Sequence, residues 1–179
     1  MDHQTILDFW FAEIEPEQWW TKDLDFDALL VQRFSDIHAA AVRCELFSWR
    51  ATPQGRLAEV IVLDQFSRNM FRDRAASFAA DPLALALAQE AVASGDDQAL
   101  TTEQRGFLYM PYMHSESLLI HKQAVPLFEA NGVAQTLDYE WQHKRIIERF
   151  GRYPHRNDIL GRESTAEEIE FLKQPGSSF

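Results

Sequence analysis

The sequence of 179 residues contains a single cysteine, Cys44, which forms no internal disulfide and leaves no CxxC pair for a structural zinc site. Because disulfides are common in oxidising compartments, this scarcity favours a reduced, cytoplasmic location. The opening residues are acidic and carry no positively charged stretch ahead of their apolar residues. We therefore expect no secretory signal peptide.

Long apolar runs and familiar cofactor motifs are also missing. The longest apolar runs fall far short of the roughly 20 residues that cross a bilayer. The sequence has no glycine-rich loop for a dinucleotide or phosphate, no GxSxG elbow and no HExxH zinc spacing. We therefore expect no membrane-spanning segment, no bound metal and no cofactor.

Basic residues are few, because 17 Lys and Arg stand against 28 Asp and Glu, a formal net charge of −11. Nucleic acids and anionic lipids both require a basic face on the protein. The charge balance therefore argues against either as a partner. Hydrophobic residues, at 46% of the chain, are typical of one globular domain, which we place at residues 1–179.

Helix-forming residues dominate, since Ala and Leu account for 39 residues and the strand-favouring Ile, Val and Thr for 23. No segment alternates polar and apolar residues as a strand does. The fold class predicted is all-α, a compact antiparallel array of about seven helices. We expect them at about 25–44, 53–69, 81–95, 101–111, 116–130, 134–150 and 164–174.

Local signals mark several helix ends, and two prolines should bend or break the helices that contain them, at Pro111 and Pro126. Gly151 is suited to the left-handed end of the 134–150 helix. N-cap and capping-box spacing is found at Thr52, Asp81, Thr101 with Gln104, and Ser164 with Glu167.

The helix expected at 53–69 carries charged residues in the middle of its apolar face. Asp64 and Arg68 are four residues apart, a spacing at which opposite charges pair. A charged pair that faces a core is costly unless it is well hydrogen-bonded. The pair therefore either anchors the core or lines a pocket, and Gln65 and Asn69 lie beside it.

His143 lies at the centre of the apolar face of the 134–150 helix, where a lone histidine is most often a satisfied core residue. A donor-rich turn follows it, and residues 140–162 hold six Lys or Arg against three Asp or Glu. Arginine forks suit carboxylate or phosphate, which predicts an anion pocket. Alternatively, these arginines neutralise the acidic first fifty residues. The predicted ligand-binding residues are Arg68, Asn69, Gln65, Arg152, His155, Arg156 and Asn157.

A third polar cluster, His114, Ser115 and Glu116, lies where the 116–130 helix should begin. Ser115 is a suitable N-cap. A histidine base with an orienting carboxylate is a common proton-transfer pair. We expect His114 or His143 to transfer the proton, oriented by Glu116 or Asp64. The predicted catalytic residues are His114, Glu116, His143 and Asp64.

Seven motifs together resemble a known pattern. They are Ile6-Leu-Asp-Phe-Trp-Phe11, Asp64-Gln-Phe-Ser-Arg-Asn69, Ser77-Phe-Ala-Ala-Asp-Pro82, His114-Ser-Glu116, Phe150-Gly-Arg-Tyr-Pro-His-Arg-Asn157, Ile159-Leu-Gly-Arg-Glu-Ser-Thr165 and Pro175-Gly-Ser-Ser-Phe179. The chain resembles the bacterial domain-of-unknown-function 924 family. The resemblance implies a tetratricopeptide-like helical fold and supplies no activity. After Glu116 the family has an acidic residue and then a glutamine, where this chain has Ser117 and His121.

Three functions fit these patterns, and whether the protein is an enzyme stays open. We favour a pocket that binds a small anionic molecule, with acid–base chemistry as an extension. A second hypothesis is a module that binds a peptide or protein, to which the aromatic-rich residues 9–20 point, although ordinary packing also explains them. In the third, the Asp64–Arg68 pair and the arginine turn are purely structural.

Overall fold

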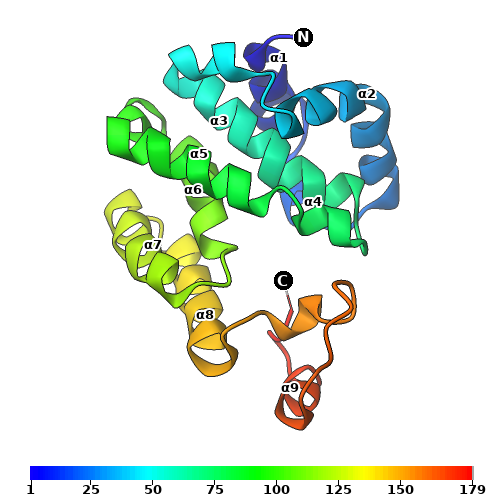
Figure 1. Ribbon diagram of the computed structural model, residues 1–179. Helices are drawn as coiled ribbons and strands as arrows, with labels where there is room; N and C mark the ends of the chain where they lie inside the picture. The colour runs from blue at the N-terminus through cyan, green and yellow to red at the C-terminus, as the bar shows by residue number, and fades with distance from the viewer. Residues whose placement is uncertain (179) are drawn as a thin grey trace.

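The computed structural model describes residues 1–178, and all regular structure in that range is helical (Figure 1). The longer helices are α2 (Leu24–Val42), α3 (Pro53–Ile61), α5 (Asp81–Ser94), α6 (Thr102–Met113), α7 (Leu118–Asn131) and α8 (Ala134–Phe150). The shorter helices are α1 (His3–Asp8), α4 (Ser67–Met70) and α9 (Ala166–Phe171). The all-α prediction is confirmed, whereas the tetratricopeptide likeness stays a prediction.

Short 3₁₀ turns connect several of these helices, at Pro16–Trp19, Phe47–Ala51, Ala75–Phe78, Asp96–Ala99 and Pro154–Arg156. Within residues 1–178, no helix is both long enough and apolar enough to cross a membrane. Phe179, the last residue of the C-terminal motif, lies outside the described residues.

The main core joins the N-terminal segment to α2, α3, α5 and α6, and aromatic rings fill much of it. Phe9 and Trp10 are almost fully buried. Trp19 is half-buried, and its indole N–H donates to the backbone carbonyl of Trp10 at 2.9 Å. Trp20 is exposed, yet its ring stacks on Phe107. Packing therefore accounts for most of the aromatic residues at the N-terminus.

The second half of the chain continues as packed neighbours, α6 against α7 and α7 against α8. Beyond α8 the C-terminal arm, residues 151–178, returns beneath α4 (Figure 1). Ile146, Ile147 and Tyr153 form a small separate core that also receives Phe171 of α9. This arm brings the arginine-rich turn back toward the start of α5.

Helix ends agree with the local signals at some positions and differ at others. Helix α6 continues through Pro111 and α7 through Pro126, so neither helix ends at its proline. The N-cap of α7 is Ser117, whereas the sequence had indicated Ser115. The capping box of α9 is Thr165 with Glu168, one residue later than the predicted Ser164 with Glu167.

The segment expected as one helix at 53–69 is α3 and α4 joined by a π-helical turn, Val62–Phe66. Thr52 caps its start, since its hydroxyl accepts from the N–H of Gly55. All five residues of the π turn are buried. Such turns widen a helix and recur at functional sites. Here the turn carries Asp64 into the interior.

Candidate functional site

Asp64 is fully buried, and donors from three side chains surround its carboxylate. Nδ1 of His114 lies 2.8 Å from Oδ1, and Nη1 of Arg68 lies 3.0 Å from the same oxygen. Nε2 of Gln65 donates to Oδ2 at 2.6 Å. Burial raises the pKa of this carboxyl, but the charge of Arg68 and the hydrogen bonds from His114 and Gln65 outweigh it and hold the pKa below its usual range. Asp64 is therefore an ionised hydrogen-bond acceptor at neutral pH.

Arg68 bridges two carboxylates. Besides Asp64, one turn earlier, it reaches Asp81 at the start of α5, with Nη1 and Nη2 lying 3.0 and 3.1 Å from the two carboxylate oxygens. Its Nη1 also donates to the backbone carbonyl of Asp64. The expected pairing of Asp64 with Arg68 is present, and the two-point pairing engages both oxygens of the Asp81 carboxylate.

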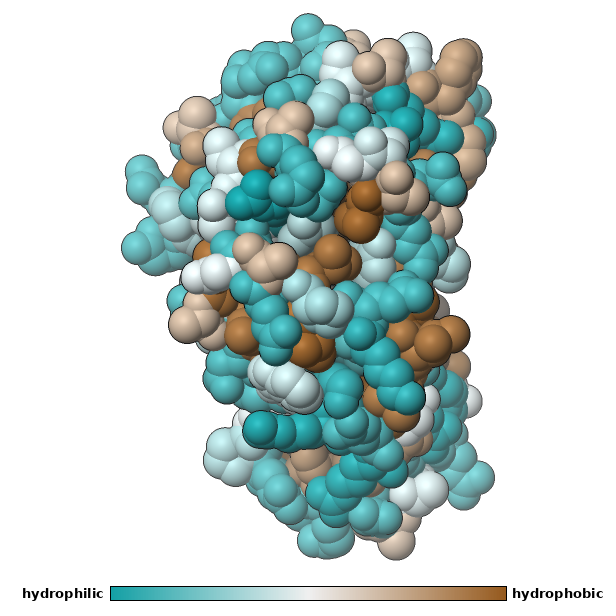
Figure 2. All heavy atoms as spheres, turned by 90° about the vertical axis from the view of Figure 1, so that its left-hand side faces the viewer, coloured by the Kyte–Doolittle hydropathy of each residue, from teal (hydrophilic) through white to brown (hydrophobic). Residues whose placement is uncertain are grey.

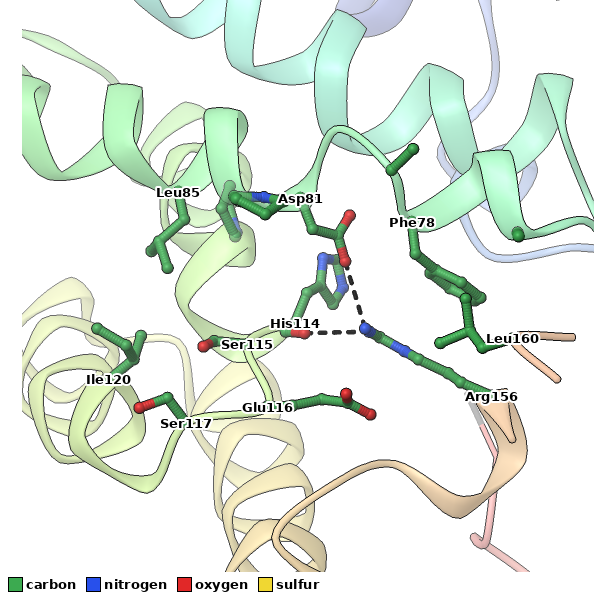
Figure 3. A pocket seen from close by; sticks show the side chains of 14 residues that line it. Phe78, Asp81, Leu85, His114, Ser115, Glu116, Ser117, Ile120, Arg156 and Leu160 are labelled. Atoms are coloured by element: carbon green, nitrogen blue, oxygen red, sulfur yellow. Dashed lines mark hydrogen bonds and ion pairs between the residues drawn. The ribbon is translucent and has the colours of Figure 1, made fainter. Parts of the chain in front are cut away.

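His114 is the C-cap of α6, directly after Met113, and points toward the start of α5 (Figure 3). Because the ionised Asp64 only accepts hydrogen bonds, Nδ1 of His114 must carry the proton, which leaves the Nε2 lone pair. Burial and the charge of Arg68 lower the pKa of the imidazole. His114 is therefore a neutral imidazole of fixed tautomer at neutral pH.

Arg156 comes from the 3₁₀ turn of the C-terminal arm and lies between two aromatic rings. Its guanidinium carbon is 4.4 Å from the ring centre of Phe78 and 4.7 Å from that of Tyr153. It donates to Asp81 at 3.3 Å and to the carbonyl of His114 at 3.1 Å (Figure 3). Its Nε is buried and has no hydrogen-bond partner within residues 1–178.

The charge of Arg156 is poorly compensated. Its side chain is only 8% exposed, and the carboxylate of Asp81 is already paired with Arg68. Burial and the charge of Arg68 lower the pKa of Arg156, although Asp81 opposes the shift. Taking a cation out of water without a full counter-charge is unfavourable.

Glu116 clamps the C-terminal arm rather than a histidine. Its carboxylate accepts two hydrogen bonds from Arg162, at 2.6 and 2.9 Å, and one from the backbone N–H of Tyr153 at 2.7 Å. These interactions lower the pKa of Glu116 despite its burial. Of the two carboxylates expected to orient a histidine, Asp64 is the one that contacts His114.

These groups border a pocket of about 470 Å³ between α5, the α6–α7 connection and the C-terminal arm (Figure 3). Its titratable side chains are those of Asp81, His114, Glu116 and Arg156, and the serines Ser115 and Ser117 also line it. The rest of its wall is largely apolar, including Phe78, Pro82, Leu85, Pro111, Ile120 and Leu160. The arrangement combines a guanidinium, a neutral imidazole and apolar surface in one cavity.

Comparison with known proteins identifies the family. The model of a family described as "Bacterial protein of unknown function (DUF924)" matches residues 6–176. The chain belongs to this family. A solved structure of a protein of unknown function from Agrobacterium tumefaciens is 42% identical over 96% of each chain, with a TM-score of 0.91. No curated protein matches the sequence. The resemblance inferred from the motifs is confirmed.

In this DUF924 chain, His143 and His155 lie around the ring of Tyr153 and not on the pocket wall. The ring of His143 is 6.4 Å from that of His114, and its Nδ1 donates to the carbonyl of Tyr139 at 2.7 Å. Burial lowers the pKa of His143 to about 3 and that of His155 to about 4. Both are therefore neutral at pH 7.

Besides Arg68, four other predicted ligand-binding residues do not line the pocket. Arg152 forms a two-point ion pair with Glu168 of α9, and Asn157 donates to the same carboxylate. Asn69 accepts from Arg72, which pairs with α2 on the other side of α4. Gln65 lies behind the pocket as a ligand of Asp64 and does not line the cavity.

The alternative that the arginines of 140–162 neutralise the first fifty residues is wrong. Every acidic partner of an ion pair from this segment lies at residue 81 or later.

Within residues 1–178, no group of three or more His, Cys, Asp or Glu is arranged to hold a metal ion.

The site also contains residues that the sequence did not single out for function. Asp81 was predicted only as the N-cap of a helix. It is instead the first residue of α5, after the N-cap Ala80, and it holds both arginines of the site. Phe78 and Tyr153 form the aromatic clamp on Arg156. Phe78 and Tyr153 both lie in motifs that carry the family resemblance, and that resemblance was the signal in the sequence that could have identified them as site residues.

Proposed function

We propose that the pocket binds a small anionic molecule through Arg156. The observation that supports this most directly is a guanidinium that is 8% exposed, clamped between two rings, with a buried Nε–H that has no partner in the described chain. Its carboxylate neighbour, Asp81, is shared with Arg68. An incoming anion would complete the charge and hydrogen bonding of Arg156.

The proposal includes acid–base chemistry at His114. Asp64 fixes the proton on Nδ1, so Nε2 is the nitrogen that would accept a proton from a bound molecule. The same division of labour, in which a buried carboxylate holds a histidine tautomer, operates in hydrolase triads. We place this chemistry in the cytoplasm, because Cys44 is a free, exposed thiol.

Thermal unfolding in the presence of small carboxylates and phosphates tests the binding proposal. At least one anion should raise the melting temperature of the wild type, and Arg156→Leu should abolish that rise. Arg149→Leu is the matched control, because Arg149 also stacks on two rings and pairs with a carboxylate, Glu167, but lies outside the pocket. If no anion shifts the wild type, or if both variants respond alike, the proposal is wrong.

The alternative of an interaction module rests on one observation. Trp20 is 63% exposed, and large exposed aromatics are enriched at protein interfaces. A pull-down with wild type and a Trp19→Ala, Trp20→Ala double variant tests it. Loss of a specific partner in the variant would favour the module, whereas identical protein profiles would count against binding through this surface.

A further inference from the structure

We infer that the pocket takes a small, singly charged carboxylate that carries an apolar body, such as a short aliphatic or aromatic acid. This rests on the proposed function, because it names the ligand class for the same pocket. The juxtaposition that carries it is one incompletely paired guanidinium at one end of a cavity whose other end is largely apolar, with two serines as its polar side chains.

The apolar end is built by two helices that face each other. Leu85 projects from α5 and Ile120 from α7, and Figure 3 shows both on the side of the pocket away from Arg156, with the small hydroxyl side chains of Ser115 and Ser117 beside them. Pro82 and Pro111 line the same cavity. Hydrocarbon buried against such surfaces contributes about 25 cal/mol per Å². A ligand that is polar throughout, such as a sugar phosphate, would leave this surface without a partner.

The exterior also carries apolar side chains at the level of this part of the fold. On the face shown in Figure 2, the most hydrophobic side chains gather across the middle of the molecule, at the height of α5 and α7 in Figure 1. More hydrophilic side chains cover the regions above and below (Figure 2). A volume of about 470 Å³ lies within the 300–1,000 Å³ usual for small-molecule sites.

The charges at the polar end limit the ligand to one negative charge. Arg68 and Arg162 are each committed to two-point pairs, with Asp81 and Glu116 respectively. Among the described residues, Arg156 is thus the one arginine that lines the pocket, and two carboxylates share that wall with it. A second negative charge on the ligand would face these carboxylates in a partly desolvated site, where like charges repel strongly.

The chemistry of the head group follows from the guanidinium. Arginine pairs with planar carboxylates through parallel N–H donors, and the aromatic rings on Arg156 hold its plane in place. His114 lines the same pocket, and its Nε2 lone pair would accept from a hydroxyl or amino group beside the carboxylate. The pocket therefore suits a carboxylate head with room for one neighbouring donor.

Isothermal titration calorimetry on the full chain tests the inference with hexanoate, phenylacetate, acetate, succinate and inorganic phosphate. Each buried CH₂ strengthens binding by about fourfold. Hexanoate or phenylacetate should therefore bind at least tenfold more tightly than acetate, which has the charge without the body. Succinate and phosphate should bind at least tenfold more weakly than the better of the two, because each carries additional negative charge.

Two neighbouring residues of α7 provide the matched variants. Ile120→Ser introduces a polar group on the pocket wall and should weaken hexanoate at least fivefold while leaving acetate unchanged. Leu119→Ser alters a side chain that is 67% exposed and does not line the pocket, so it should leave every affinity unchanged.

The outcomes separate the two proposals. Tight, Arg156-dependent binding of phosphate or succinate would overturn the monocarboxylate inference and leave anion binding standing. An equal affinity for acetate and hexanoate would also overturn it. Binding of none of the five probes would overturn this inference, and together with an unresponsive anion screen it would remove the proposed function as well.

Discussion

His143 and His155 should make the protein lose stability between pH 7 and pH 5. Burial lowers the pKa of His143 to about 3 and that of His155 to about 4. In the unfolded chain both return to about 6.5. The unfolded state therefore binds more protons than the folded state below pH 6.5, so the free energy of unfolding falls as the pH falls.

The magnitude follows from the two pKa values. At pH 5 an unfolded histidine is almost fully protonated, whereas His143 and His155 stay neutral in the fold. Each histidine therefore costs about 2 kcal/mol between pH 7 and pH 5. Buried His38 and His114 shift in the same direction and add to the loss. Against a typical total of 5–15 kcal/mol, the effect is large.

Ionised carboxylates do not contribute in this window. Asp64 and Glu168 have lowered pKa values in the fold, so the stability that they contribute is lost only below about pH 4, where the unfolded carboxyls protonate. Glu140 is the exception, because burial raises its pKa, so its proton uptake in the fold opposes the loss from the histidines as the pH falls. The difference between the wild type and a histidine variant therefore isolates that histidine.

Urea unfolding at pH 7 and pH 5 measures the effect directly. His143→Gln removes one titrating group, and its loss of stability between the two pH values should be about 2 kcal/mol smaller than that of the wild type. Gln135→Ala, an exposed change in the same helix, should retain the full wild-type loss. A loss in His143→Gln equal to that of the wild type would show that His143 is not held neutral by burial.

Three further changes test the packing around the site and the core. Arg50→Ala should destabilise the fold by about 3 kcal/mol in urea unfolding, because it leaves the fully buried carboxylate of Glu59 without its ion pair. Gly55→Ala should cost about 1–3 kcal/mol in the same assay, since a Cβ would lie 2.0 Å from the carbonyl oxygen of Trp49. Glu116→Gln should raise hydrogen exchange in residues 151–178 and leave α3 protected; unchanged exchange in the arm would refute its role as a clamp.

Local signals predicted the helices well, because a capping or periodicity signal needs only neighbouring residues. Thr52 and the Thr101–Gln104 capping box lie where the sequence indicated. Other boundaries moved because several suitable caps lie in a row, as in the Ser164–Thr165 pair, and tertiary packing selects one. The π turn was not predictable from a fixed step of 100° per residue, which assumes an unbroken α-helix.

At the site, too, contacts between residues close in sequence were predicted, and contacts between residues far apart in sequence were not. The Asp64–Arg68 pairing follows from a four-residue spacing and is present. The role of Asp81 depends on contacts with residues 13 and 75 positions away, and its place at a helix start offered a sufficient local explanation. Within the donor-rich turn, the sequence does not indicate which way each side chain points. Arg152 and Arg156 were therefore predicted alike, although Arg152 pairs with Glu168 and Arg156 with Asp81.

Asp64→Asn tests the central element of the proposed chemistry, the fixed tautomer of His114. The carboxylate receives donors from Arg68, His114 and Gln65, so an amide nitrogen at either oxygen position would face a donor. The variant should lose about 3–5 kcal/mol in urea unfolding, the usual cost of breaking a buried charge pair.

Nitrogen-15 NMR of the imidazoles measures the tautomer itself. In the wild type at pH 7, His114 should carry its proton on Nδ1, because the ionised carboxylate of Asp64 accepts there. In Asp64→Asn the amide group can either accept or donate, so the preference for Nδ1–H should weaken. A wild-type His114 protonated on Nε2 would place the lone pair against Asp64 and remove the proton acceptor from the pocket. That result would defeat the acid–base proposal while leaving anion binding by Arg156 to be judged on its own variants.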